Sequence, residues 1–333
     1  MDIHSRHALV GDIGGTYLSF AIADIDELTI DHFALLSAAD FASPMDALKR
    51  YLESLPRWPK KASVAVAGKV EAGRARMTFR PWTITETDIR ATTGAETVTL
   101  LNDIEALALA LPHLTVDELV PVQAGTPAAR APKLVINAGT GLGIATLAPA
   151  DDGWTVVRGQ AEDMAAPALR PGEFDLHVAF APGEFISAQA LFSGAGLVRL
   201  YRALAGHHGH TAGAHSAPQI TDAARAGEDR AAVEAVRLMG IWFARFAGDV
   251  ALLVGATGGV FLAGGLSANV VPLLGREVFC AAFADKGDAR ASLEAIPVTV
   301  IKTGADAGLR GAAVALARHL DRQEAPSRIL RVG

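Results

Sequence analysis

Two segments rich in glycine and threonine, far apart in the chain, contain residue types that could bind the phosphates of a nucleotide. Each lies between two apolar runs typical of buried strands, so each predicts a β-hairpin with a glycine turn. Backbone N–H groups and a threonine hydroxyl can surround phosphate oxygens. A single copy would be equally typical of an ordinary hairpin, and the repetition favours phosphate binding. The predicted nucleotide-binding residues are Gly11, Asp12, Ile13, Gly14, Gly15 and Thr16 in the first turn, and Gly139, Thr140 and Gly141 in the second.

Two better-known phosphate motifs do not fit this sequence. A P-loop requires the pattern GxxxxGK[ST], which does not occur in the chain. A dinucleotide-binding fingerprint requires a third glycine at the start of a helix. After Gly139 and Gly141 that position is Ile144, and the residues around it are typical of a strand.

Asp103 is the strongest candidate for a catalytic residue. It lies between an apolar run at 98–101, which predicts a buried strand, and an apolar helix at 104–111. Open α/β sheets present ligand-binding groups at this end of their strands. The Asp103 carboxylate could accept the proton of an attacking hydroxyl, while Asn102 could hydrogen-bond a neighbouring hydroxyl. Alternatively, Asp103 only caps the following helix, and spacing alone does not decide between the two roles.

Two further features could contact a bound nucleotide. Asp12 could hold Mg²⁺ through water, because hard cations prefer carboxylates and keep several waters. Its alternative role is to stabilise the turn by side-chain hydrogen bonds. Gly264 and Gly265 end a predicted strand just before a helix, where bare backbone could admit a base or ribose. Tight packing between strand and helix would explain these two glycines equally well.

The four histidines at positions 207, 208, 210 and 215 lie among glycine and alanine, without neighbouring carboxylates. A metal site needs a fixed ligand geometry. A solvated loop therefore explains these histidines better than a metal site does, and we expect no metal there.

Composition limits the function classes. A chain of 333 residues with 50% hydrophobic residues predicts two globular domains. The formal net charge of −6 gives no basic field, so nucleic acid and anionic membranes are not expected partners. Cys280 is the only cysteine, which excludes an intramolecular disulfide. No apolar run is long enough to span a bilayer, so we expect a cytoplasmic protein.

The order of the predicted elements favours an α/β fold, because apolar strands alternate with helices along the chain. Ser43-Pro44 predicts a capped helix start, and Thr85 with Asp88 predicts another. The apolar strand at 62–67 is expected to pair with a strand at 74–79. The repeated glycine hairpin suggests two related halves with a cleft between them.

Together these residues resemble the bacterial glucokinase family, within the superfamily of actin, hexokinase and Hsp70 ATPases. The two glycine turns are similar to its two phosphate motifs, and Asn102-Asp103 to its sugar and catalytic-base element. The run from Ser193 to Tyr201 is similar to the segment that follows its sugar-binding glutamate. The run from Gly258 to Gly265 is similar to its adenosine motif. The matches occur in the family's order and extend over nearly the whole chain.

The resemblance implies two RNase H-like (actin-like ATPase) domains with an interdomain cleft. Residues 1–110 with 306–333 would form the small domain, and residues 111–305 the large domain. The implied cofactors are ATP and Mg²⁺, with Asp12 holding the ion through water. The implied reaction is phosphorylation of a hexose, most simply glucose, at its 6-hydroxyl, with Asp103 as the base. The resemblance leaves a homodimer open.

The sequence departs from the family at the predicted sugar site. Gln160-Ala161-Glu162-Asp163 stands where the family has Glu-Gly-Gly-His, and Gln189 stands in place of a glutamate. By alignment, Gln160, Asp163 and Gln189 would face the sugar together with Asn102 and Asp103. Glutamine keeps hydrogen-bonding capacity but lacks the charge of a carboxylate. A kinase for another sugar, or a sugar-binding regulator that has lost catalysis, is therefore the alternative hypothesis.

Overall fold

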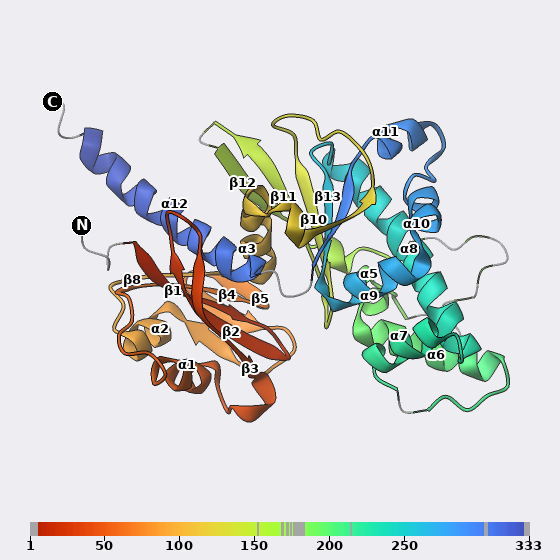
Figure 1. Ribbon diagram of the computed structural model, residues 1–333, viewed down its shortest axis with the longest axis horizontal. Coiled ribbons are helices and arrows are strands. Elements are labelled where there is room, and N and C mark those ends of the chain that lie inside the picture. The colour runs from red at the N-terminus through yellow and green to blue at the C-terminus, as the bar shows by residue number, and fades with distance from the viewer. Residues whose placement is uncertain are drawn as a thin grey trace. The chain divides into compact units, whose positions relative to one another are not determined.

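The computed structural model describes residues 6–151, 153–167, 170, 173, 175, 184–213, 215–302 and 306–329. The chain divides into two compact units (Figure 1). Unit 1 comprises Met1–Leu114 and Asp306–Gly333, and unit 2 comprises Thr115–Ala305. Residues 1–5 and 330–333 of the predicted small domain, and 303–305 of the predicted large domain, lie outside the described residues.

Unit 1 is built on a five-stranded sheet in the order β3-β2-β1-β4-β8. The first three strands form an antiparallel meander, and β4 and β8 continue the sheet in parallel with β1. Continuous apolar runs explain why β1 and β4 are central, since buried strands lack a polar face. The strands are β1 (His7–Ile13), β2 (Tyr17–Asp24), β3 (Ile30–Ser37), β4 (Lys61–Val66) and β8 (Thr97–Asn102).

Helices cover both faces of this sheet. On one face Phe20 of β2 stacks on Tyr51, with ring centroids 5.5 Å apart. On the other face α12 packs against β1, β4 and α3 (Figure 1). The predicted helix starts are confirmed: Ser43 caps α1 ahead of Pro44, and Thr85 forms a capping box with Asp88. The helices are α1 (Pro44–Leu52), α2 (Glu86–Thr93), α3 (Asp103–Ala110) and α12 (Ala307–Ile329).

The predicted pairing of the strands at 62–67 and 74–79 is wrong. Both edges of β4 are occupied by β1 and β8, so no edge is left for a further strand. The segment at 74–79 instead contributes β6 to a separate three-stranded antiparallel sheet. This small sheet contains β5 (Gly68–Glu71), β6 (Arg74–Met77) and β7 (Thr83–Thr85).

Unit 2 repeats the same arrangement, with the order β12-β11-β10-β13-β14-β9. The strands β10, β11 and β12 form the antiparallel meander, β13 and β14 follow in parallel, and β9 pairs antiparallel with β14. The strands are β9 (Leu119–Gln123), β10 (Lys133–Ala138), β11 (Leu142–Ala150), β12 (Gly153–Arg158), β13 (Val260–Ala263) and β14 (Val298–Ile301).

The core of unit 2 is organised around the long helix α8, whose Phe243 and Phe246 pack on Phe192 at 5.4 and 5.3 Å between ring centroids. Trp242 of the same helix is fully buried. The helices are α5 (Ala188–Leu191), α6 (Gly194–His207), α7 (Ala217–Ala226), α8 (Arg230–Val254), α9 (Gly264–Leu274), α10 (Arg276–Phe283) and α11 (Arg290–Glu294).

The two sheets therefore share one plan, a three-stranded meander followed by two parallel strands. This plan confirms the expected α/β class with two RNase H-like domains. Both predicted glycine hairpins are also confirmed: Ile13 pairs with Leu18 across the first turn, and Ala138 with Leu142 across the second.

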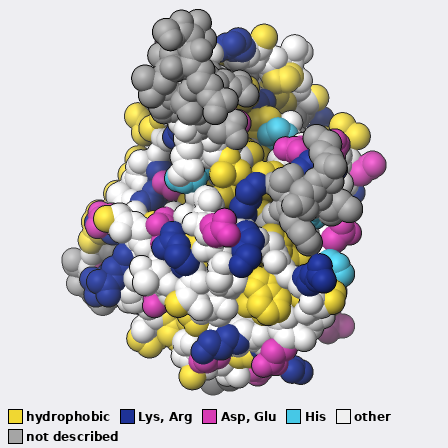
Figure 2. All heavy atoms as spheres, turned by 90° about the vertical axis from the view of Figure 1, so that its left-hand side faces the viewer, with side chains coloured by type: hydrophobic (Ala, Val, Ile, Leu, Met, Phe, Trp, Pro, Cys, Tyr) yellow, Lys and Arg dark blue, Asp and Glu magenta, His cyan; other side chains and the backbone are white. Residues whose placement is uncertain are grey.

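Within the described residues, no single helix has the length and hydropathy of a membrane span. Only α9 and α10 taken together reach that threshold, and a bend of 107° separates them. On the face of the molecule seen in Figure 2, Lys and Arg side chains are interspersed with Asp and Glu side chains.

Candidate active site

The first glycine turn joins β1 to β2 in unit 1 and is held by the backbone around it. The N–H of Gly14 donates to the carbonyl oxygen of Tyr17 at 2.9 Å. The Arg80 side chain donates from Nε to the carbonyl oxygen of Gly15 at 2.7 Å, and its guanidinium lies 4.7 Å from the centre of the Trp82 ring. Arg80, which the sequence did not single out, therefore fixes the turn from outside.

Asp12 lies next to the end of β1, opposite Ser19 of β2 and Ala65 of β4. Its side chain is half-buried, and no described residue donates a hydrogen bond to it. Burial raises the pKa of this carboxyl to about 6. A partly desolvated carboxylate that accepts no hydrogen bond from the described residues suits Mg²⁺, which binds through one or two carboxylates, waters and substrate phosphates. The carboxylate of Asp12 is therefore a suitable ligand group for the expected ion.

Asn102 and Asp103 are adjacent residues at the junction of β8 and α3. Asn102 is the N-cap of α3, and its Oδ1 accepts from the N–H of Ile104 at 3.0 Å. Its Nδ2 donates to the carbonyl oxygen of Gly68 at 2.7 Å. Asp103 is the first residue of the helix and is half-buried. Asn102 is therefore the N-cap residue, and Asp103 Oδ1 accepts a second hydrogen bond from the same Ile104 N–H at 2.9 Å.

The second glycine turn, between β10 and β11 of unit 2, is held by two elements that lie later in the chain. The N–H of Gly139 donates to Gly141 O at 2.8 Å, and the N–H of Gly194 donates to Gly139 O at 2.9 Å. Gln189 Oε1 accepts from the N–H of Leu142 at 3.4 Å. The turn is therefore fixed by α5 and by the start of α6.

Gly264 and Gly265 begin α9 beside this turn. Gly264 has φ +87°, and a Cβ there would overlap the carbonyl oxygen of Ala138 at the end of β10. At Gly139 a Cβ would lie 3.8 Å from the nitrogen of Gly265, whereas a Cβ on Gly265 would meet nothing within 4 Å. The structure thus brings the second turn and the predicted adenosine motif together within unit 2.

The segment with Gln160 and Asp163 is hydrogen-bonded through its backbone to the start of the helix that contains Gln189. Gln160 and Asp163 are exposed on the short 3₁₀ turn after β12, and Gln189 lies half-buried on α5. The N–H of Ala188 donates to Met164 O at 2.8 Å, which ties the turn to α5. Gln160 Nε2 donates to the carbonyl oxygen of Gly159 at 2.9 Å.

Glu162, between Gln160 and Asp163, was not predicted as a site residue. Its Oε2 is buried and has no hydrogen-bond partner among the described residues. Burial raises the pKa of this carboxyl, and the neighbouring Asp163 raises it further. An unpartnered buried oxygen would have been difficult to foresee, because sequence does not reveal the surroundings of a side chain.

The histidine segment contains no metal cluster in the part of the chain that the structure describes. His208 Nε2 instead lies 2.8 Å from Glu234 Oε2, and the His215 ring packs edge-on against Tyr201 at 5.4 Å.

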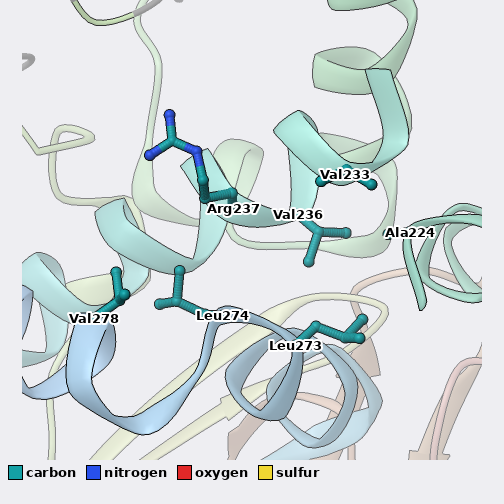
Figure 3. Close-up of a pocket in the computed structure, with 7 residues that line it drawn as sticks. All are labelled: Ala224, Val233, Val236, Arg237, Leu273, Leu274 and Val278. Carbon is teal, nitrogen blue, oxygen red and sulfur yellow. The ribbon is translucent and has the colours of Figure 1, made fainter. Parts of the chain in front are cut away.

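A separate groove in unit 2 has a volume of about 230 Å³ and lies between α7, α8, α9 and α10 (Figure 3). None of the candidate site residues lines it. In Figure 3 the guanidinium of Arg237 points away from the apolar side chains. The lining residues are Ala224, Val233, Val236, Arg237, Leu273, Leu274 and Val278.

Comparison with known proteins connects these features. The model of the glucokinase family matches residues 9–319. A glucokinase of Saccharophagus degradans is 34% identical over 298 residues, which cover 88% of this chain and 93% of the relative. The crystal structure of a glucokinase from an Antarctic psychrotroph is 29% identical, has a TM-score of 0.79, and covers 94% of this chain and 99% of that chain.

A more distant structure shares the fold. The ROK family glucokinase from Streptomyces griseus, in complex with glucose and AMPPNP, is 20% identical with a TM-score of 0.65. The match covers 94% of this chain and 99% of that chain. The family model spans most of this sequence, and the relatives are matched over nearly their whole length. This chain belongs to the glucokinase family.

Proposed function

We propose that this protein is an ATP-dependent glucokinase that transfers the γ-phosphoryl group of ATP to the 6-hydroxyl of glucose. The observation that carries the proposal is at the start of α3, where one residue is the N-cap and the next presents a carboxylate. Asn102 caps the helix, and the adjacent Asp103 carboxylate lies at the carboxyl end of the parallel strand β8. A carboxylate at such a strand end is well placed to act on a bound substrate.

In the proposed reaction, Asp103 accepts the proton of the 6-hydroxyl as the oxygen attacks the γ-phosphorus. Phosphoryl transfer passes through a loose transition state in which charge is spread over the phosphoryl oxygens. Most of the catalysis then comes from positioning and from groups that stabilise this charge. The backbone N–H groups and threonine hydroxyls of the two glycine turns are our candidates for that task.

Mg²⁺ bound with ATP would neutralise charge on the phosphates, and Asp12 would hold the ion through water. Because no described group of side chains could form an all-protein cage, the ion would be carried mainly by the nucleotide. Gly264 and Gly265 would let the adenosine approach the start of α9. The small domain would comprise residues 1–110 with 306–333, and the large domain residues 111–305.

Glucose is the proposed substrate, with Gln160, Asp163 and Gln189 contributing hydrogen bonds in addition to Asn102 and Asp103. The amides of Gln160 and Gln189 in place of carboxylates favour one alternative, a kinase for a different hexose. A site that hydrogen-bonds particular hydroxyls discriminates strongly between sugars, so two such changes could shift specificity. A regulator that binds sugar without phosphorylating it is the second alternative.

The test is a coupled assay of ADP release over a panel of hexoses, with the 6-phosphate identified by mass spectrometry. Glucose should give the highest kcat/KM. A higher value for another sugar would move the substrate assignment, and tight sugar binding without ADP release would establish the regulator. A cytoplasmic location and a homodimer belong to the same proposal, and light scattering at micromolar concentration tests the dimer.

A further inference from the structure

Gly308, in the first turn of α12, lies directly against the side chain of Asp12. A Cβ built on Gly308 would overlap Oδ2 of Asp12 and would lie 3.0 Å from its Cγ and 3.5 Å from its Cβ. The first two of these distances are too short for ordinary packing, whereas the third is a normal van der Waals contact. The carboxylate of Asp12 therefore occupies the space that any side chain at position 308 would need.

Neither backbone in this contact is free to move. Asp12 is held in the ladder between Ser19 and Ala65. The start of α12 is held by Ala307 and Leu309, which are 3% and 2% exposed. One turn later, a Cβ at Gly311 would overlap the carbonyl oxygen of Ala106 in α3, so the helix already lies at the closest distance that glycine permits.

The only soft element in the contact is the side chain of Asp12, which has two rotatable bonds and no donor among the described residues. We propose that Gly308 is a positioning residue: its missing side chain sets where the Asp12 carboxylate stands. This inference rests on the proposed function, in which Asp12 holds the ion of MgATP through water. It assigns a role to α12, which comes from the far end of the sequence.

A methyl group at position 308 should turn the Asp12 carboxylate aside while leaving the fold intact. Misplacing a catalytic group by about 1 Å can lower the rate by roughly 10²-fold. Gly308→Ala should therefore lower kcat by about that factor without changing KM for glucose. Its melting temperature should stay the same or rise, since alanine favours helix more than glycine does.

Isothermal titration with ADP provides a readout that does not depend on catalysis. Wild-type protein should bind ADP more tightly in Mg²⁺ than in EDTA, and Gly308→Ala should lose most of that difference while keeping its affinity in EDTA. Gly206→Ala is the matched control, because Gly206 also lies in a helix and its Cβ would meet nothing within 4 Å. This control should keep wild-type kinetics and wild-type Mg²⁺ dependence.

The Asp12→Ala background tests the contact itself. With the carboxylate gone, the Cβ of residue 12 lies at a normal distance of 3.5 Å from the methyl at 308, so Gly308→Ala should change neither stability nor ADP binding there. If Gly308→Ala alone fails to fold, folding of the double variant would still support the proposal. Unfolding of both variants would overturn it, and so would wild-type kcat and Mg²⁺ dependence in Gly308→Ala. Absence of hexose phosphorylation by the wild type would instead contradict the proposed function. The titration with ADP would still show whether Gly308 positions the Asp12 carboxylate.

Discussion

The Nδ2 group of Asn102 donates a hydrogen bond to the carbonyl oxygen of Gly68 at 2.7 Å, which ties the N-cap of α3 to the start of β5. The Oδ1 of the same side chain accepts a hydrogen bond from the N–H of Ile104. Asn102 therefore caps α3 and also binds the neighbouring strand β5. Substitution at Asn102 and at Asp103 can therefore test the N-cap and the proposed catalytic carboxylate separately.

Asp103→Asn should leave folding and ATP binding nearly unchanged and lower kcat by about 10²–10⁴-fold, because asparagine cannot take the proton. Steady-state kinetics with glucose measures the effect. The matched control is Glu105→Gln, which alters the capping box of α3 and should affect melting temperature more than kcat. Retention of most activity in Asp103→Asn would show that this carboxylate is not the base.

Gly264→Ala and Gly265→Ala form a matched pair at the start of α9. Alanine at 264 would overlap the carbonyl oxygen of Ala138 in a left-handed backbone, which alone costs about 1–3 kcal/mol. Alanine at 265 has open space, so its unfolding free energy should stay close to that of the wild type. Urea unfolding compares the two variants. Equal losses of stability would contradict the geometry at Gly264.

Thr140→Val combined with Gly139→Ala should raise KM for ATP more than KM for glucose. Valine removes a hydroxyl donor. The methyl at 139 fits within the protein, because its nearest neighbour would be Gly265 N at 3.8 Å. It would, however, keep a phosphate from approaching the backbone of the turn closely. Initial rates over both substrates separate the effects. An increase confined to glucose would assign this turn to the sugar.

The triple change Gln160→Glu, Asp163→His and Gln189→Glu restores the side chains that the family has at the sugar site. Each restored charged hydrogen bond would contribute about 1.5–3 kcal/mol if it is well aligned. Glutamate at 189 can still accept from the N–H of Leu142. Titration with glucose should show tighter binding in the triple variant than in single variants. Weaker binding in a folded triple variant would indicate a site adapted to another ligand.

The raised pKa of Asp12 predicts a pH dependence of stability in EDTA. Well below pH 3.8 the carboxyl is protonated in both the native and the unfolded state, so its burial does not reduce the free energy of unfolding. As pH rises from 3.8 to about 6, the unfolded chain releases the proton before the native state does, so stability falls. The loss should be about 1–3 kcal/mol, allowing for partial solvation. Asp12→Asn should lack this loss and be the more stable protein at pH 7, as urea unfolding at several pH values can show.

Sequence alone was sufficient for features that depend on neighbouring residues. The two glycine hairpins and the caps at Ser43 and Thr85 follow from short-range patterns, and the structure confirms them. The family resemblance was also predicted from the order of the motifs, and the family match over residues 9–319 confirms it.

Features that depend on distant partners were not predictable in this way. The predicted partner of β4 is wrong because β1 and β8 pair with its two edges. The residues of β4 alone do not indicate which strands pair with it. The contact between Asp12 and Gly308 joins the two ends of the chain, and glycine in a helix gives no sign of what lies against it. The roles assigned to the predicted site residues stay predictions until the variants are measured.

Unit 1 is assembled from both ends of the chain, and this has a consequence during synthesis on the ribosome. The strands of its sheet are translated before unit 2, but α12, which packs against β1 and β4, is translated after unit 2. Before α12 is synthesised, one face of the sheet lacks the helix that packs against it. Unit 2 is a single stretch of sequence, so all of its core residues are available earlier. Truncation before α12 would therefore damage unit 1 although every strand of its sheet is present, and a nascent chain exposes this face of the sheet until α12 has been synthesised.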